Sequence, residues 1–170
     1  MTKHHAVHAH RRRHSRAQAL VEFSLVAPIF FLMIFAVIEG GRFILYYQTL
    51  NNAVREGARY AIVHGSNSFC PSGPMPPGSS TPGGCYDASG ANVAQQVRTT
   101  AFGVLGTGVT VTTCWDPVIA SDGSCTNGGL GNGRDSEVRV TGVYTYRSLV
   151  PIVPLPAISI SAESNLVINN

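Results

Sequence analysis

A run of 19 residues from Leu20 to Ile38 constrains this chain more than any other feature, because it contains a single charged residue, Glu22. A helix rises about 1.5 Å per residue, so a run of this length matches the roughly 30 Å hydrocarbon core of a membrane. The run therefore predicts a membrane-spanning helix with one carboxylate near its beginning.

Positive charge is concentrated ahead of this run. Five of the 12 Lys and Arg residues precede it, namely Lys3, Arg11, Arg12, Arg13 and Arg16. Short cationic flanks stay in the cytoplasm, so we expect a cytoplasmic N-terminus and an extracytoplasmic location for the chain after Ile38. A cleaved secretory signal is the competing interpretation. Its apolar region usually has about 7–15 residues and ends at a small-x-small site, and the residues after Ile38 form a poor site of that kind.

The helix is predicted to continue beyond the span with one apolar stripe. Residues that step by three or four positions share a helix face, and here they are Phe43, Tyr47, Leu50, Val54, Ala58 and Ala61. Arg55 and Arg59 lie towards another side, with Glu56 three residues before Arg59 as an ion-pair candidate. Gly57 costs a helix roughly 1 kcal/mol relative to alanine, so we expect close packing at that position.

Two separated motifs carry a resemblance to a known family. Residues 18–23 read Gln-Ala-Leu-Val-Glu-Phe, Pro28 lies in the span, and residues 53–59 read Ala-Val-Arg-Glu-Gly-Ala-Arg. Over about residues 11–64 the chain resembles the TadE-like family. Those proteins are minor pilin-like proteins, or pseudopilins, of the tight-adherence (Flp) pilus machinery.

The resemblance implies a structural role and a processing site. In that family a prepilin peptidase cuts before the residue four positions ahead of the glutamate, which here places the cut between Ala17 and Gln18 and makes Glu22 the fifth mature residue. The family usually has glycine at the position of Ala17. The implied partners are the membrane, the peptidase, other pilin-like subunits and the pilus assembly platform, and the implied role is in pilus assembly or at the pilus tip.

Physical chemistry gives Glu22 a role that is independent of the resemblance. A carboxylate inside a membrane helix is costly unless it is paired, so its presence indicates a partner. The amine that a cut would create on Gln18 of a neighbouring subunit is such a partner. The alternative is that Glu22 lies hydrated in the headgroup region.

The leader, residues 1–17, contains five of the six histidines: His4, His5, His8, His10 and His14. A His-rich tract can bind metal, but this one has no cysteine or carboxylate companions. We therefore interpret it as a solvated basic leader that contacts anionic lipid. Removing the leader leaves seven Lys and Arg residues against nine Asp and Glu residues, a formal charge of −2. Nucleic-acid binding by the exported part is not expected, because no basic patch remains.

Four cysteines follow the span, at positions that an oxidising compartment would allow to pair. Among the three possible connectivities we favour Cys70–Cys85 with Cys114–Cys125, because each bond closes one flexible loop. Zinc binding is the rival interpretation, but the spacing contains no C-x-x-C. The first of these loops, Ser66–Asn92, is rich in Pro, Gly and Ser and is predicted to be an extended loop or linker.

The remaining chain predicts one small head domain, residues 65–170, after the helix of residues 18–64. A capping box at Asn92–Gln95 predicts a short helix to about Leu105, with Val93, Val97, Ala101 and Leu105 on one face. Alternation predicts strands at 109–115, 137–146 and 157–168. The proline-studded residues 150–156 are interpreted as an edge loop packed on the head. The expected fold class is α+β, with an antiparallel sheet of three or four strands.

No catalytic motif accompanies these elements. His64 is the only histidine of the exported part and has no G-x-S-x-G near it. Asp116, Asp122 and Asp135 have a spacing that fits no calcium loop. We therefore expect no enzyme, cofactor or metal. Two functions remain, a structural pilus-assembly subunit and a permanently membrane-anchored binding or adhesive domain, and cleavage after Ala17 together with dependence on Glu22 would distinguish them.

Overall fold

The computed structural model describes residues 6–80, 84–149 and 156–169. The elements in chain order are α1 (Ala6–Val63), α2 (Ala91–Leu105), β1 (Val109–Trp115), β2 (Val118–Ile119), β3 (Cys125–Thr126), β4 (Glu137–Tyr146) and β5 (Ile158–Val167). The chain divides into two compact units, residues up to Arg42 and residues Phe43–Asn170. The α+β class, the long N-terminal helix and the antiparallel sheet are confirmed.

The first unit contains the predicted membrane-spanning segment as part of α1. Within the described part of the chain, α1 is the one helix long and apolar enough to cross a membrane. No residue of its most apolar stretch is buried. Pro28 lies inside the helix. The helix begins upstream of the predicted start, at Ala6, so residues 6–17 of the leader are helical as well.

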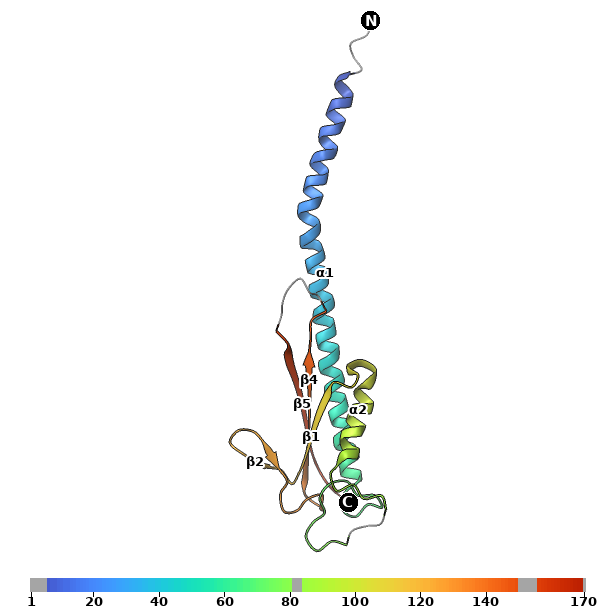
Figure 1. Cartoon of the computed structure of the whole chain (residues 1–170), viewed down its shortest axis with the longest axis vertical. Coiled ribbons are helices and arrows are strands. Elements are labelled where there is room, and N and C mark those ends of the chain that lie inside the picture. Colours follow the sequence, from blue (N-terminus) through green and yellow to red (C-terminus); the bar gives the residue numbers. More distant parts are fainter. Residues whose placement is uncertain (1–5, 81–83, 150–155, 170) are drawn as a thin grey trace. The chain divides into compact units, whose positions relative to one another are not determined.

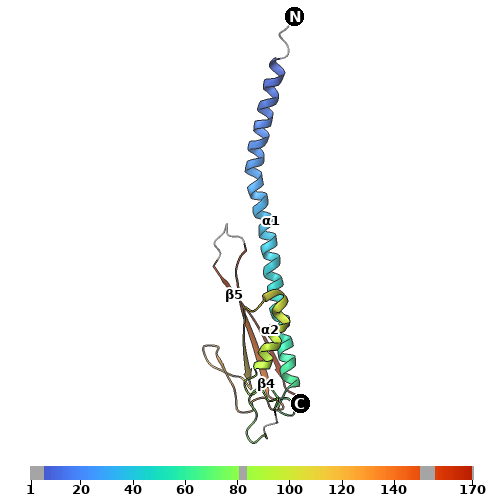
Figure 2. The same ribbon diagram turned by 45° about the vertical axis from the view of Figure 1, so that its right-hand side comes forward.

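The second unit is a three-stranded antiparallel sheet covered by helices. The strand order is β1-β4-β5, with Val109 opposite Tyr144 in one pair and Tyr146 opposite Ile158 in the other. Figure 1 shows α2 beside the last turns of α1, next to this sheet. The β2–β3 hairpin forms a separate two-stranded sheet that stands away from the larger one (Figure 2).

Apolar side chains from both helices and all three strands form one core. The buried members are Leu50, Ala53, Val54, Ala58, Ala61, Val93, Val97, Ala101, Leu105, Val109, Trp115, Val138, Val140, Tyr146, Ile160, Ala162 and Ile168. This includes the whole predicted stripe of α2. Close backbone approach brings α1 onto the sheet, because a Cβ on Gly142 would lie 2.7 Å from Val54 Cγ2 and 3.1 Å from Leu50 Cδ1.

The prediction that Tyr47 belongs to the apolar stripe of α1 is wrong. Tyr47 is 49% exposed, whereas Tyr46 packs against the core. Both positions flank the stripe at 3.6 residues per turn, and the contacts made by the sheet decide between them. The Tyr46 ring meets Tyr144 and Tyr146 edge-on, with centroids 5.6 and 5.5 Å apart, an arrangement that aromatic rings favour.

The predicted capping box at the start of α2 is also wrong. The N-cap is Gly90 in a left-handed conformation (φ 71°) and Asn92 lies inside the helix. Instead, Asp87 Oδ2 accepts a hydrogen bond from the Asn92 N–H at 2.7 Å. Partial burial acts to raise the pKa of Asp87, but this bond and those from Ser89 and Ala91 together lower it below its usual value. Asp87 therefore caps the helix as a carboxylate from outside it.

The described residues of the Pro- and Gly-rich segment after α1 are bonded to the rest of the head. Asn132 is fully buried and donates from Nδ2 to the Ser72 carbonyl oxygen at 2.8 Å. Its N–H donates to the Pro74 carbonyl, and its own carbonyl accepts from Ser66. Three hydrogen bonds of Asn132 thus satisfy backbone groups of this loop, in addition to an isolated parallel bridge between Ser72 and Asp87.

Trp115 gives the same segment its packing surface. The indole is 1% exposed, and Gly73 and Gly90, both with positive φ, lie against it. A Cβ on Gly73 would overlap the ring and one on Gly90 would lie 3.2 Å from Nε1. The interpretation as a linker is therefore replaced by that of a packed loop. The apolar loop predicted at 150–156 falls almost entirely outside the described residues.

Candidate functional site: the assembly segment of the first helix

The residues predicted for processing and assembly lie on consecutive turns of α1. Ala17, Gln18 and Glu22 are all exposed. Gln18 Nε2 donates to Glu22 Oε1 at 3.3 Å, which is the i, i+4 contact that one helical turn allows. The side chain of the residue that a cut would make N-terminal therefore already contacts the carboxylate. This side-chain contact was not predicted, although the spacing of four residues between Gln18 and Glu22 indicates it.

Most apolar side chains around Glu22 and along the span are exposed. Leu20, Phe23 and Ile29 have 69, 68 and 71% of their surface exposed, and the following aromatic residues are also open. Soluble monomers rarely leave a contiguous apolar surface of this kind uncovered. This surface suits lipid or other apolar helices, and in either environment Glu22 is a charge that needs a partner.

An ion pair follows the span. Arg42 Nη1 lies 3.1 Å from Glu39 Oε2, three positions along the helix. These are the first charged residues after Glu22, so they mark where the apolar segment ends. This pair was not predicted, although its i, i+3 spacing favours such a contact.

The motif at residues 55–59 divides between the core and the solvent. Gly57 is buried against α2 and β4: a Cβ there would overlap Val97 Cγ2 and lie 3.6 Å from the Val93 carbonyl oxygen. Arg55 is exposed. Arg59 lies 3.8 Å from Glu56, and their side chains are 73 and 45% exposed, so this ion pair contributes little to stability.

The four cysteines form two bonds within the head. Cys70 is joined to Cys85 and Cys114 to Cys125, with Cα atoms 5.2 and 6.2 Å apart. This is the pairing favoured on loop closure. The first bond closes the loop that packs on Trp115, and the second closes the base of the β2–β3 hairpin.

The three aspartates considered for calcium serve separate turns. Asp116 Oδ2 accepts from the Leu130 N–H at 3.0 Å. Asp122 Oδ1 accepts from the Ser124 N–H at 2.8 Å. Asp135 has φ 64° and donates its N–H to the Ile168 carbonyl oxygen. Among the described residues, no three His, Cys, Asp or Glu side chains lie close enough together to hold a metal ion.

Comparison with known proteins gives one match, to a family model. The model described as TadE-like protein matches residues 17–59, so the chain contains a TadE-like segment that begins at Ala17 and ends at Arg59. Neither the comparison with curated proteins nor that with solved structures returned a match. The matched segment contains the Gln18–Glu22 contact, the exposed span and the 55–59 motif.

Proposed function

We propose that this chain is a minor pilin-like subunit of a tight-adherence pilus machinery, inserted in the membrane through α1. The observation that carries the proposal is the TadE-like match over residues 17–59, since that family is a pilin-like structural family. Its partners are then other components of that pilus system, including pilin-like subunits and the assembly platform.

Two features of the chain support membrane anchoring with an exported head. Most apolar side chains of the span, residues 20–38 of α1, are exposed and need lipid or neighbouring helices. Disulfides persist in exported compartments, and both bonds lie after the span. The basic leader adds positive charge on the side of the N-terminus, which favours a cytoplasmic location for that end.

The mechanism joins the leader, the cut and Glu22. A prepilin peptidase hydrolyses the bond between Ala17 and Gln18, which removes five fixed positive charges and leaves an ammonium group on Gln18. Within one chain, Gln18 and Glu22 lie one turn apart, as their 3.3 Å side-chain contact reflects. Both groups therefore have similar membrane depth, so the ammonium of an entering subunit can meet Glu22 of its neighbour. That pairing offsets the several kcal/mol that burying either charge alone would cost.

Intact-mass measurement of the protein from its native membrane tests the cut. We expect a mass that lacks residues 1–17. Ala17→Gly should preserve or improve cleavage and the bulky Ala17→Leu should block it, because the peptidase site accepts a small residue there. An uncut wild-type protein would contradict the processing step.

Glu22→Ala tests the pairing. We expect normal membrane insertion and head folding but loss of incorporation into pili, because the ammonium of the neighbouring subunit would be left buried and unpaired. Ser24→Ala is the matched control, since it removes a polar group from the same turn without changing charge. If the protein keeps residues 1–17 and Glu22→Ala assembles normally, the pilin-like role is refuted, and a permanently anchored binding domain replaces it.

A further inference from the structure

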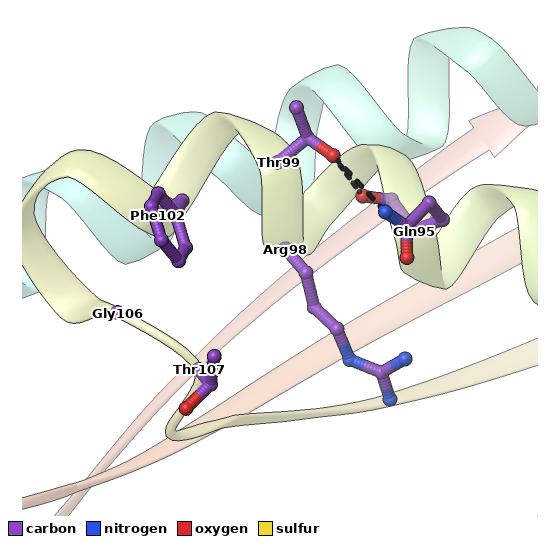
Figure 3. A pocket seen from close by; sticks show the side chains of 6 residues that line it. All are labelled: Gln95, Arg98, Thr99, Phe102, Gly106 and Thr107. Carbon is purple, nitrogen blue, oxygen red and sulfur yellow. Dashed lines mark hydrogen bonds between the residues drawn. The ribbon is translucent and has the colours of Figure 1, made fainter.

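A groove runs along the outer side of α2, where the helix meets the start of β1. Its volume is about 320 Å³, and it is lined by Gln95, Arg98, Thr99, Phe102, Gly106 and Thr107. Figure 3 shows Arg98 and Phe102 projecting from neighbouring turns of α2 towards the segment that carries Thr107. Sites for small ligands start at roughly 300 Å³, so this groove can receive a few side chains.

The chemistry of the lining selects an acidic and apolar occupant. Arg98 is the only charged residue among the six, and no ion pair with it occurs within the described ranges. The Phe102 ring is 62% exposed. Thr99 and Gln95 are engaged with each other, since the Thr99 hydroxyl donates to the Gln95 carbonyl at 2.8 Å. This leaves one cation beside one open aromatic face.

The groove also adjoins an unpaired strand edge. β1 is an outer strand of the sheet, and its Trp115 end is covered by Gly128 and Asn127. For Val109–Thr113, the described part of the chain supplies no backbone partner on the outer side. Such an edge accepts an extended segment of another chain.

The β2–β3 arm, residues 118–126, has the complementary surface. Val118 and Ile119 are 57 and 44% exposed. Asp122 occupies the turn, where hydrogen bonds from the Ser124 hydroxyl and N–H hold the pKa of this carboxyl below its usual value. The Cys114–Cys125 bond holds the base of the arm. The arm thus presents a fixed negative charge next to apolar side chains.

We propose that the groove between α2 and β1 docks the β2–β3 arm of a second copy of this chain, with Asp122 against Arg98. Val118 and Ile119 then cover the Phe102 ring. The arm and α2 lie on opposite sides of the head in both views (Figures 1 and 2), so the contact joins two copies rather than closing within one. Because it uses two different surfaces, each copy keeps one free groove or one free arm, and the contact can repeat.

Site-specific photo-cross-linking of the full chain in its native membrane tests this contact. A benzophenone amino acid replaces Phe102, and an epitope-tagged second copy is co-expressed. We expect a cross-linked product that contains both copies, joined at a peptide within residues 118–126. Cross-links to a different protein, to residues outside the arm, or to lipid would overturn the proposal, and so would the absence of any product.

Charge exchange gives a second, independent readout. In the cross-linking strain, Arg98→Glu should lower the yield about tenfold, because like charges replace an attractive pair. Asp122→Lys should lower it similarly, and Arg98→Glu combined with Asp122→Lys should restore it. Arg134→Glu is the control, since Arg134 is exposed and does not line the groove. Failure of the double variant to restore the yield, or an equal loss with Arg134→Glu, would overturn the pairing.

Discussion

Replacing Gly57 by alanine should destabilise the head, although the same change in a helix usually stabilises it. Alanine gains about 1 kcal/mol over glycine from helix propensity. Against this, the added methyl would overlap Val97 Cγ2, while the Val93 carbonyl oxygen at 3.6 Å and Val140 Cγ1 at 3.7 Å limit any shift of α1. Overpacking of this kind costs about 1–3 kcal/mol. The net loss should therefore be about 1 kcal/mol.

Gly103→Ala provides a matched control on the exposed side of α2 in the same head. Gly103 also lies inside a helix, but a Cβ there would meet nothing within 4 Å, so propensity alone applies and the variant should gain up to about 1 kcal/mol. Urea denaturation of the full chain in detergent, followed by fluorescence of the single tryptophan, Trp115, measures both. The two midpoints should differ by about 1 M, for a typical dependence of about 2 kcal/mol per molar urea.

A second-site change separates close packing from other effects. Val97→Ala alone should cost roughly 1.6 kcal/mol for two buried methyl groups, but clearly less in the Gly57→Ala background, where it relieves the overlap. The reasoning is refuted if Gly57→Ala stabilises the head as much as Gly103→Ala does, or if the two changes at positions 57 and 97 are simply additive.

Two further predictions concern the loop that packs on Trp115. Replacing both Cys70 and Cys85 by serine should lower the free energy of unfolding by about 3 kcal/mol, the chain-entropy value for a loop of this size. Peptide mapping of the wild-type protein without reductant should find both disulfide bonds. Four free thiols would contradict them. Asp87→Asn should destabilise the head at neutral pH, because the charged carboxylate is favoured in the folded state. Its lowered pKa makes that contribution present above pH 3.8 and lost as the pH falls through the folded value, so wild type and variant should converge in acid. A stability difference between wild type and Asp87→Asn that persists below the folded pKa would contradict the lowered pKa of Asp87.

The bounds of the three long strands could be predicted from the local alternation of apolar residues. The bounds predicted for β1 and β4 agree with the structure, and β5 is one residue shorter at each end than predicted. Ten residues of alternation leave little freedom in β4, because a shift of one residue would turn every apolar side chain to the solvent. The stripe of α2 was predictable for the same kind of reason.

The predictions failed where contacts with residues distant in the sequence determine the structure. Tyr46 and Tyr47 are equivalent by helix periodicity, and only contact with Tyr144 and Tyr146 separates them. Likewise, the composition of the Ser66–Asn92 loop resembles that of a linker, yet Gly73 and Gly90 of this loop pack against Trp115. The periodicity of a short stretch of sequence does not reveal contacts with residues as distant as Tyr144, Tyr146 or Trp115.

For the candidate sites too, features local in the sequence could be predicted and features that depend on the fold could not. Glu22 stands out locally, as one charge in an apolar run, and its contact with Gln18 follows from helix spacing. The groove at Arg98 and Phe102 was not predictable, because it exists only once Gly106 and Thr107 fold back beside α2. Its two key residues occupy the polar side of an amphipathic helix, where exposed side chains are common and carry no signal of their own.

The order of the strands in the chain has a consequence for synthesis. The buried stripe of α1, including Leu50 and Val54, is made well before β4 and β5, the strands that cover it. Contacts between distant segments form slowly, because a long loop must close before they gain anything. A growing chain therefore exposes this stripe until β4 and β5 have emerged. Any product truncated before β5 keeps an uncovered apolar helix and a lone β4 edge, and is expected to aggregate or to require a chaperone rather than to fold.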